Sequence, residues 1–219
     1  MDILRRLGRY MRDREFRLAT LKATALFCIG IILNTFGSIY ATERASNYVS
    51  DLILSNTRVY HLDGLFVYGA LFVIMFAFAI LVRDPKTIPF TLASIGLFYL
   101  TRSVFISLTH LGPFPTHADL ELGMLLNLVF GGGDYFFSGH TGAPFLLALL
   151  FWRDTILRYL FLISSGVLGV VVLLTHLHYS IDVLSAFFIT YGIYHMALWL
   201  FPKEARLFHE GIPGLSGPQ

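Results

Sequence analysis

The chain of 219 residues is rich in apolar side chains and poor in charged ones. Hydrophobic residues make up 56% of it and aromatic residues 16%, its mean hydropathy is +0.69 and its formal net charge is +2. Asp, Glu, Lys and Arg account for only 14%, too few to cover a water-facing surface. The composition therefore excludes a soluble enzyme and indicates a membrane protein.

A single cysteine, Cys28, lies within an apolar run. One cysteine excludes a secreted module held by disulfides and a cysteine-based zinc site. We expect Cys28 to be a small, buried hydrophobic side chain.

The N-terminal segment, residues 1–22, holds seven Lys and Arg residues and three acidic ones. This pattern predicts a basic amphipathic segment on the anionic cytoplasmic face of a bilayer. The apolar run that follows could belong to a secretory signal, but it is about twenty residues long and no convincing cleavage site closes it. We therefore interpret the run as a first transmembrane span.

Six apolar stretches are close to the length that crosses hydrocarbon, the fourth only if it is lengthened or tilted. They are Ala23–Tyr40, Gly64–Val82, Ile88–Thr109, Thr141–Trp152, Tyr159–Leu177 and Val183–Phe201. A membrane β-barrel would have shorter, alternating segments. The sequence thus predicts an all-α, polytopic membrane domain of six transmembrane helices over residues 23–201, followed by a flexible cytoplasmic tail over residues 202–219.

The basic residues are unevenly divided between the two predicted sides of the membrane. Thirteen of the sixteen Lys and Arg residues lie on the side that holds both termini. By the positive-inside rule, this side is the cytoplasm. Six of the eight histidines gather at the opposite, non-cytoplasmic side, where proton-transfer chemistry is expected: His61, His110, His117, His140, His176 and His178.

A glycine-rich stretch, residues 131–142, enters the fourth predicted span. Glycines let backbone N–H groups approach an anion, and the start of a helix adds a favourable dipole, so the stretch suits a phosphate. The alternative is a re-entrant turn whose glycines only permit tight packing. The presence of His140 beside Ser138 favours the phosphate site.

A second polar stretch, residues 176–182, opens the sixth predicted span. His178 and Asp182 are four residues apart, so if the helix has begun by His178 they lie on one face, where the carboxylate can hold the imidazole in one tautomer. An Asp within an apolar segment indicates a functional site. A buried pair that only stabilises the bundle is the alternative, and His176 suits a supporting position.

Arg102, followed by Ser103, lies within the third span, about seven residues or roughly 10 Å from its non-cytoplasmic end. A snorkelling arginine would need no function. Because it faces the same interface as the histidine motifs, we favour phosphate binding by its guanidinium. A zinc or iron site is less favoured, because its ligands would have to converge from several loops. We expect no metal and no cofactor.

These residues carry a resemblance to the sphingomyelin synthase family, a branch of the type 2 phosphatidic acid phosphatase superfamily. Residues 133–141 (GDYFFSGHT) resemble its third motif and residues 176–183 (HLHYSIDV) its fourth. Arg102-Ser103 is similar to the second motif, and Ser50-Asp51 faintly to the first. The resemblance covers roughly residues 50–200 and implies the same six-span plan.

The chain also departs from these patterns. Gly133 stands where the family usually has cysteine, and Val49-Ser50 replaces a proline-rich stretch. Phe137 and Val172 stand where the wider phosphatase signature has proline and arginine, so the sequence leans toward the synthase branch.

The resemblance implies a phospholipid head-group phosphotransferase that works through a phosphohistidine. Its catalytic triad would be His140, His178 and Asp182, and its substrates would be a phospholipid donor and a ceramide- or diacylglycerol-type acceptor, with no nucleic acid. A lipid phosphatase is the nearest alternative, followed by a non-enzymatic lipid transporter and a metal-dependent oxygenase. The predicted phosphate- and substrate-binding residues are Arg102, Ser103, Gly133, Asp134, Ser138, Gly139, His176 and Tyr179.

Overall fold

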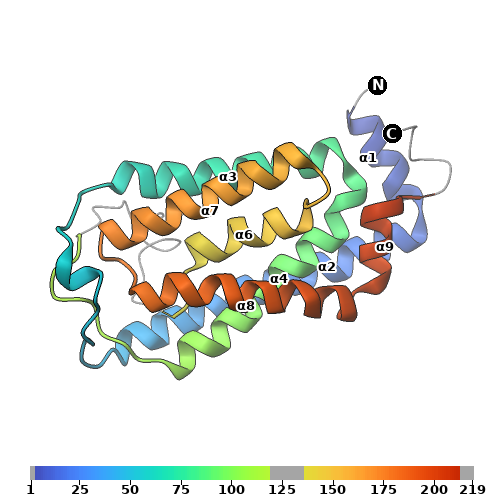
Figure 1. Ribbon diagram of the computed structural model, residues 1–219. Helices are drawn as coiled ribbons and strands as arrows, with labels where there is room; N and C mark the ends of the chain where they lie inside the picture. Colours follow the sequence, from blue (N-terminus) through green and yellow to red (C-terminus); the bar gives the residue numbers. More distant parts are fainter. Residues whose placement is uncertain (1–2, 119–135, 213–219) are drawn as a thin grey trace.

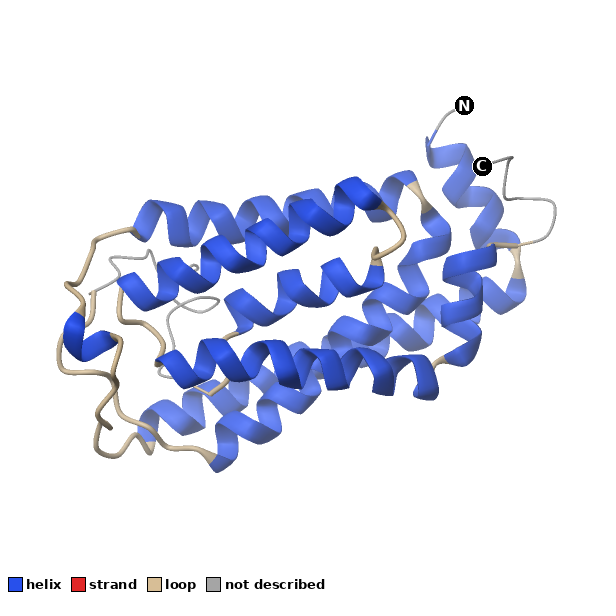
Figure 2. Cartoon of the chain, in the orientation of Figure 1, coloured by secondary structure: helices blue, strands red, loops and turns tan. Residues whose placement is uncertain are grey.

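The computed structural model describes residues 3–118 and 136–212. In these two stretches all regular structure is helical (Figure 2). The longer helices run side by side as a bundle (Figure 1). The α-helices are α1 (Ile3–Arg12), α2 (Arg14–Glu43), α3 (Asp63–Arg83), α4 (Ile88–Leu108), α6 (Gly139–Leu150), α7 (Thr155–Leu174), α8 (Ser180–Leu200) and α9 (Pro202–Glu210), and two 3₁₀ turns are η1 (Leu54–Asn56) and η2 (Pro85–Thr87).

Within the described stretches, five helices are long and apolar enough to cross a membrane: α2, α3, α4 with the preceding turn η2, α7 and α8. This finding supports a polytopic membrane protein. The predicted spans match α3, α4, α7 and α8 to within four residues at each end. α2 starts nine residues before the predicted first span, because the side chain of Asp13 caps it by accepting the N–H of Phe16 at 2.8 Å.

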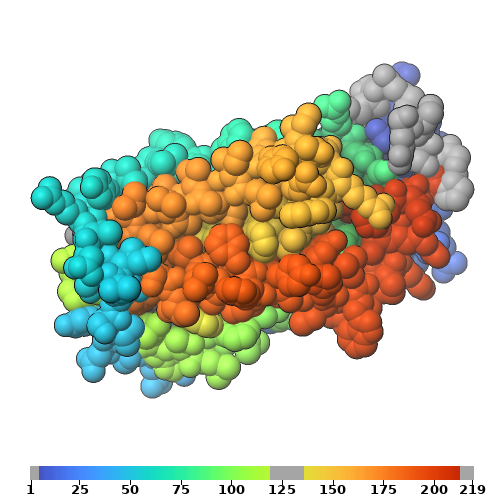
Figure 3. Space-filling model, in the orientation of Figure 1, coloured from blue at the N-terminus to red at the C-terminus, as the bar shows by residue number. Residues whose placement is uncertain are grey.

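The fourth predicted span corresponds to α6, which has only 12 residues. Such a helix is about 18 Å long, whereas a bilayer's hydrocarbon core measures about 30 Å. α6 contacts α3, α4, α7 and α8, and α7 and α8 cover most of it on the face seen in Figure 3. The described helices thus comprise five long ones and a short apolar one that packs against four of them, and a sixth full-length span is not among them.

The bundle has two distinct ends (Figure 1). We call the end that holds α1 and α9 the termini end, and the opposite end, which holds residues 44–62, 109–118 and 175–179, the loop end. The six histidines that the sequence assigned to one side all belong to segments at or near the loop end, whereas His195 and His209 do not. Which end faces the cytoplasm stays a prediction from the distribution of charge.

The segment after residue 201 differs from the flexible tail predicted for residues 202–219. Residues 202–210 form α9, in which Ala205, Leu207 and Phe208 are buried. The ring of Phe208 packs edge-on against Phe90 at 5.8 Å and lies 5.3 Å from Phe151. Burial of this apolar face holds α9 on the bundle, which the glycine and proline content beyond residue 210 did not indicate. Residues 213–219 lie outside the described residues.

Cys28 is exposed, so the prediction that it is buried is wrong. α2 packs mainly on α4, through a face lined with small side chains such as Ala23, Gly30 and Gly37. Cys28 lies off that face, where a transmembrane helix at the edge of a bundle meets lipid rather than protein. Composition alone could not tell these two apolar environments apart.

Candidate active site

The turn that leads into α8 places His178 beside Asp182. The distance from Nδ1 of His178 to Oδ2 of Asp182 is 3.5 Å, and the carboxylate is fully buried. The same oxygen accepts the backbone N–H of Tyr179 at 2.9 Å. Asp182 therefore caps the helix that carries it while it faces the imidazole, and both contacts fix how the histidine is oriented.

A backbone contact joins this turn to the start of α6. The N–H of Ser138 donates to the carbonyl of Asp182 at 3.1 Å. The hydroxyl of Ser138 caps α6 by accepting the N–H of Thr141 at 3.4 Å. The two motifs, which are about forty residues apart in the sequence, therefore meet through the main chain. Ser138, predicted to bind phosphate, holds the helix start with its side chain.

His140 lies in the first turn of α6 and faces the same region. Its ring is 4.2 Å from that of Phe66 on α3, at an interplanar angle of 34°. Its neighbour Gly139 lies against the guanidinium of Arg102, and Ser138, two residues before it, bonds to the carbonyl of Asp182. Helices α4, α6 and α8 and the turn before α8 thus contribute the members of one cluster, which we call the triad cluster: Arg102, His140, His178 and Asp182.

Arg102 is the cation of the triad cluster and is only 5% exposed. Its Nε donates to the carbonyl of Phe137 at 2.9 Å, in the turn before α6. Its Nη1 donates to Oδ1 of Asn34 on α2 at 3.0 Å. The guanidinium also lies against Gly139, where an added Cβ would be 3.4 Å from Nε. An added methyl group at position 139 would therefore make ordinary van der Waals contact with the arginine.

Asn34 was absent from the predicted site. The sequence could have indicated it, because Asn34 is the only Asn within the first predicted span. Its partner lies 68 residues away on another helix, a distance that no spacing rule along the chain reveals.

Asp51 braces the start of α8 from the loop between α2 and α3. Its Oδ2 accepts both the N–H and the hydroxyl of Ser180, at 2.8 and 2.7 Å. Burial by itself would raise the pKa of Asp51, but hydrogen bonds from Leu54, Ser180 and Ile53 outweigh it and lower the pKa below its ordinary value. An ionised carboxylate thus holds this loop against the helix that carries Asp182.

Two predicted binding residues make contacts that hold the loops together. His176 has a φ of 55°, in the left-handed region, and is 1% exposed. Its Nε2 lies 3.2 Å from Oγ1 of Thr57 and its Nδ1 2.6 Å from the carbonyl of Thr116. The hydroxyl of Tyr179 donates to the carbonyl of Gly112 at 2.8 Å. These two side chains tie three loop segments together.

Of the remaining predicted binding residues, Ser103 is described by the structure and two others are not. The hydroxyl of Ser103 donates to the carbonyl of Leu100 in its own helix at 2.7 Å. Gly133 and Asp134 lie outside the described residues, as does the rest of the Gly131–Gly133 stretch. Within residues 3–118 and 136–212, no group of three or more His, Cys, Asp or Glu side chains is placed to hold a metal ion.

The side chains of the triad cluster suit a reaction in which a bond to a phosphate group is broken and another is formed. A guanidinium offers rigid, permanently charged donors for phosphate oxygens. One imidazole is oriented by a carboxylate, and a second lies in the first turn of α6, which is bonded to Asp182 through the main chain, so a nucleophile and a proton carrier could act on the same atom.

Comparison with known proteins agrees with this chemistry. Residues 131–199 match the protein family described as PAP2 superfamily C-terminal. The match contains His140, His178 and Asp182 but covers less than half of the chain. No curated protein and no solved structure was found to match the chain.

Proposed function

We propose that the protein is a membrane phosphotransferase that moves the phospho-head group of a phospholipid to a lipid alcohol, through a phosphohistidine on His178. The observation that carries the proposal is the buried His178–Asp182 pair, bonded through the main chain to the start of α6, where His140 follows Gly139, the residue that lies against Arg102. The match of residues 131–199 to the PAP2 superfamily C-terminal family supports chemistry on lipid phosphates.

In the first half of the proposed reaction, Nε2 of His178 attacks the phosphorus of the donor. Its other ring nitrogen faces Asp182, which favours the tautomer with a proton on Nδ1 and a lone pair on Nε2. The bond between phosphorus and the diacylglycerol oxygen breaks, and protonated His140 gives its proton to that oxygen. The guanidinium of Arg102 stabilises charge on the non-bridging oxygens.

In the second half, an acceptor hydroxyl attacks the phosphohistidine. His140, now neutral, takes the hydroxyl proton, the bond between nitrogen and phosphorus breaks, and His178 returns to its starting form. A lipid alcohol such as ceramide in this step gives transfer, and water gives hydrolysis.

The test is an assay of detergent-purified protein with fluorescent ceramide and either phosphatidylcholine or phosphatidylethanolamine. We expect ceramide to gain a head group, and we expect His178→Ala to abolish this product. His195→Ala is the matched control, because His195 is an exposed residue of α8, the helix that follows His178, and its ring packs edge-on against Tyr191 with the centroids 4.5 Å apart. Substantial transfer by His178→Ala would contradict the assignment.

Lipid phosphatase activity is the second candidate, favoured by the family that residues 131–199 match. A parallel reaction with phosphatidic acid separates the two activities. Free phosphate without any head-group transfer would identify a hydrolase that uses the same residues.

A further inference from the structure

Helix α2 carries none of the motif residues, yet it reaches the triad cluster. Oδ1 of Asn34 accepts the Nη1 of Arg102 at 3.0 Å. An amide inside an apolar helix is costly to bury unless its polar atoms are satisfied. The contact with Arg102 satisfies one of them.

Close packing of α2 on α4 allows this contact. A Cβ added to Gly30 would lie 2.5 Å from the carbonyl oxygen of Gly96, and one added to Gly37 would lie 3.1 Å from Oγ of Ser107. Asn34 is four residues after Gly30 and three before Gly37, so it lies on the same face of α2. The glycines bring the two backbones close enough for a short side chain to reach the arginine.

Two acceptors from different elements hold the guanidinium. The carbonyl of Phe137 binds Nε at 2.9 Å and the amide of Asn34 binds Nη1. Because the group is planar and rigid, two bonds on different nitrogens fix its orientation as well as its place. Both of these acceptors are neutral, so neither offsets the positive charge of the arginine.

We infer that Asn34 is a positioning residue that orients Arg102 toward the phosphate of the substrate. This inference rests on the proposed function. It also explains why the acceptor is an amide: a carboxylate at position 34 would hold the guanidinium equally well but would cancel the charge that attracts a phosphate.

The test is a double-mutant cycle with Asn34→Leu and Arg102→Ala in the purified protein. The readouts are kcat and KM for the lipid substrate, and stabilisation of the protein against heat by orthovanadate, which needs no turnover. Asn34→Asp is added because it keeps the acceptor and changes the charge. Thr35→Val is the matched control, because the Thr35 hydroxyl donates to Ile31 in its own helix.

We expect Asn34→Leu to weaken orthovanadate stabilisation and to lower kcat/KM roughly tenfold, the size typical of a hydrogen bond to a charged group. We expect the same change to have no effect in the Arg102→Ala background. Asn34→Asp should fold normally and also bind orthovanadate more weakly, whereas Thr35→Val should match the unmodified protein.

An equal loss from Asn34→Leu in both backgrounds would overturn the inference, because Asn34 would then act on the fold rather than through Arg102. Unchanged activity in Asn34→Leu, with activity lost in Arg102→Ala, would overturn it while leaving the proposed function in place. Full activity in both Arg102→Ala and His178→Ala would instead refute the proposed function.

Discussion

The two ends of the bundle use charge in opposite ways. Near the loop end, Arg102 is 5% exposed and has acceptors on two elements, and Asp182 is fully buried beside His178 and Tyr179. At the termini end, Arg206 and Glu15 form an ion pair at 3.7 Å with side chains 59% and 60% exposed. Charges that are withdrawn from water interact strongly and are costly to leave unpaired, whereas solvent screens an exposed pair.

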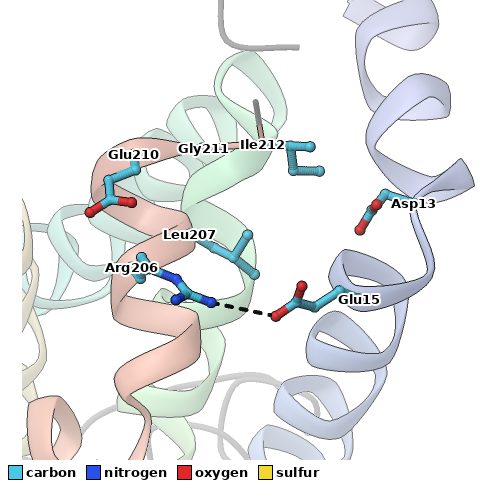
Figure 4. A pocket seen from close by; sticks show the side chains of 7 residues that line it. All are labelled: Asp13, Glu15, Arg206, Leu207, Glu210, Gly211 and Ile212. Carbon is cyan, nitrogen blue, oxygen red and sulfur yellow. Dashed lines mark ion pairs between the residues drawn. The ribbon is translucent and has the colours of Figure 1, made fainter. Parts of the chain in front are cut away.

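The ion pair at the termini end borders a hollow of about 450 Å³ (Figure 4). Asp13 and Glu15 from the start of α2 face Arg206 and Leu207 of α9 across it. The same type of residue, a carboxylate, thus lines an open hollow at one end and orients a buried imidazole near the other. The difference predicts that substitutions near the loop end have large effects and those at the termini end small ones.

The largest effect is expected from Asp182→Asn. The change keeps the size of the side chain and an oxygen for the N–H of Tyr179, so the protein should fold. The orientation of His178 is lost together with the charge that faces it, and turnover should fall by about 10²-fold to 10⁴-fold. Lipid product formed per minute measures the effect, and an unchanged melting temperature would show that the fold is intact. Wild-type turnover would remove Asp182 from the mechanism.

Arg102→Ala should lower kcat/KM by about 10²-fold to 10³-fold, since it removes a charged donor for the phosphate oxygens. Arg102→Lys should recover only part of the loss, because an ammonium cannot bind Phe137 and Asn34 with one rigid group. Steady-state kinetics at several lipid concentrations test both variants. Arg206→Ala is the control, and an equal loss from this exposed arginine would contradict the contrast between the two ends.

Asp51→Asn should cost about 1–3 kcal/mol of stability at neutral pH, because Ser180 and the η1 turn lose a charged acceptor. The pKa of Asp51 is lowered in the folded protein, so its contribution is complete above the ordinary value of 3.8 and is lost as the pH falls through the folded-state value. The stability difference between the two proteins should therefore shrink below pH 3.8. Denaturant titrations in detergent at several pH values measure it, and a constant difference would argue against an ionised brace.

The smallest effect is expected from Glu15→Gln. Its partner Arg206 is as exposed as Glu15 itself, and pairs of this kind contribute less than about 1 kcal/mol. The melting temperature should change little and the turnover should not change. A clear drop in turnover would couple the termini end to the triad cluster and break the comparison between the two ends.

Much of the fold followed from the sequence because its signals are local. Long apolar runs placed α3, α4, α7 and α8 to within four residues, since the cost of burying polar backbone in lipid requires helices of nearly fixed length. The spacing of His178 and Asp182 predicted that they meet, and they do, although His178 lies in the turn before α8 and only Asp182 belongs to the helix. The helix α6 was predicted, but as a transmembrane span. A short apolar run indicates a helix, but it does not tell whether protein or lipid surrounds that helix.

The sequence by itself therefore determined the membrane setting, helices α3, α4, α7 and α8 and the pair of motifs that bear the histidines. Only the tertiary structure decided that the motifs meet through Ser138 and Asp182, that Asn34 holds Arg102, and that Asp51 braces Ser180. The physical reason is the range of the interactions. Hydrophobicity and helix periodicity act between neighbours in the chain, whereas a hydrogen bond between residues 68 or 129 positions apart depends on how whole helices and loops pack.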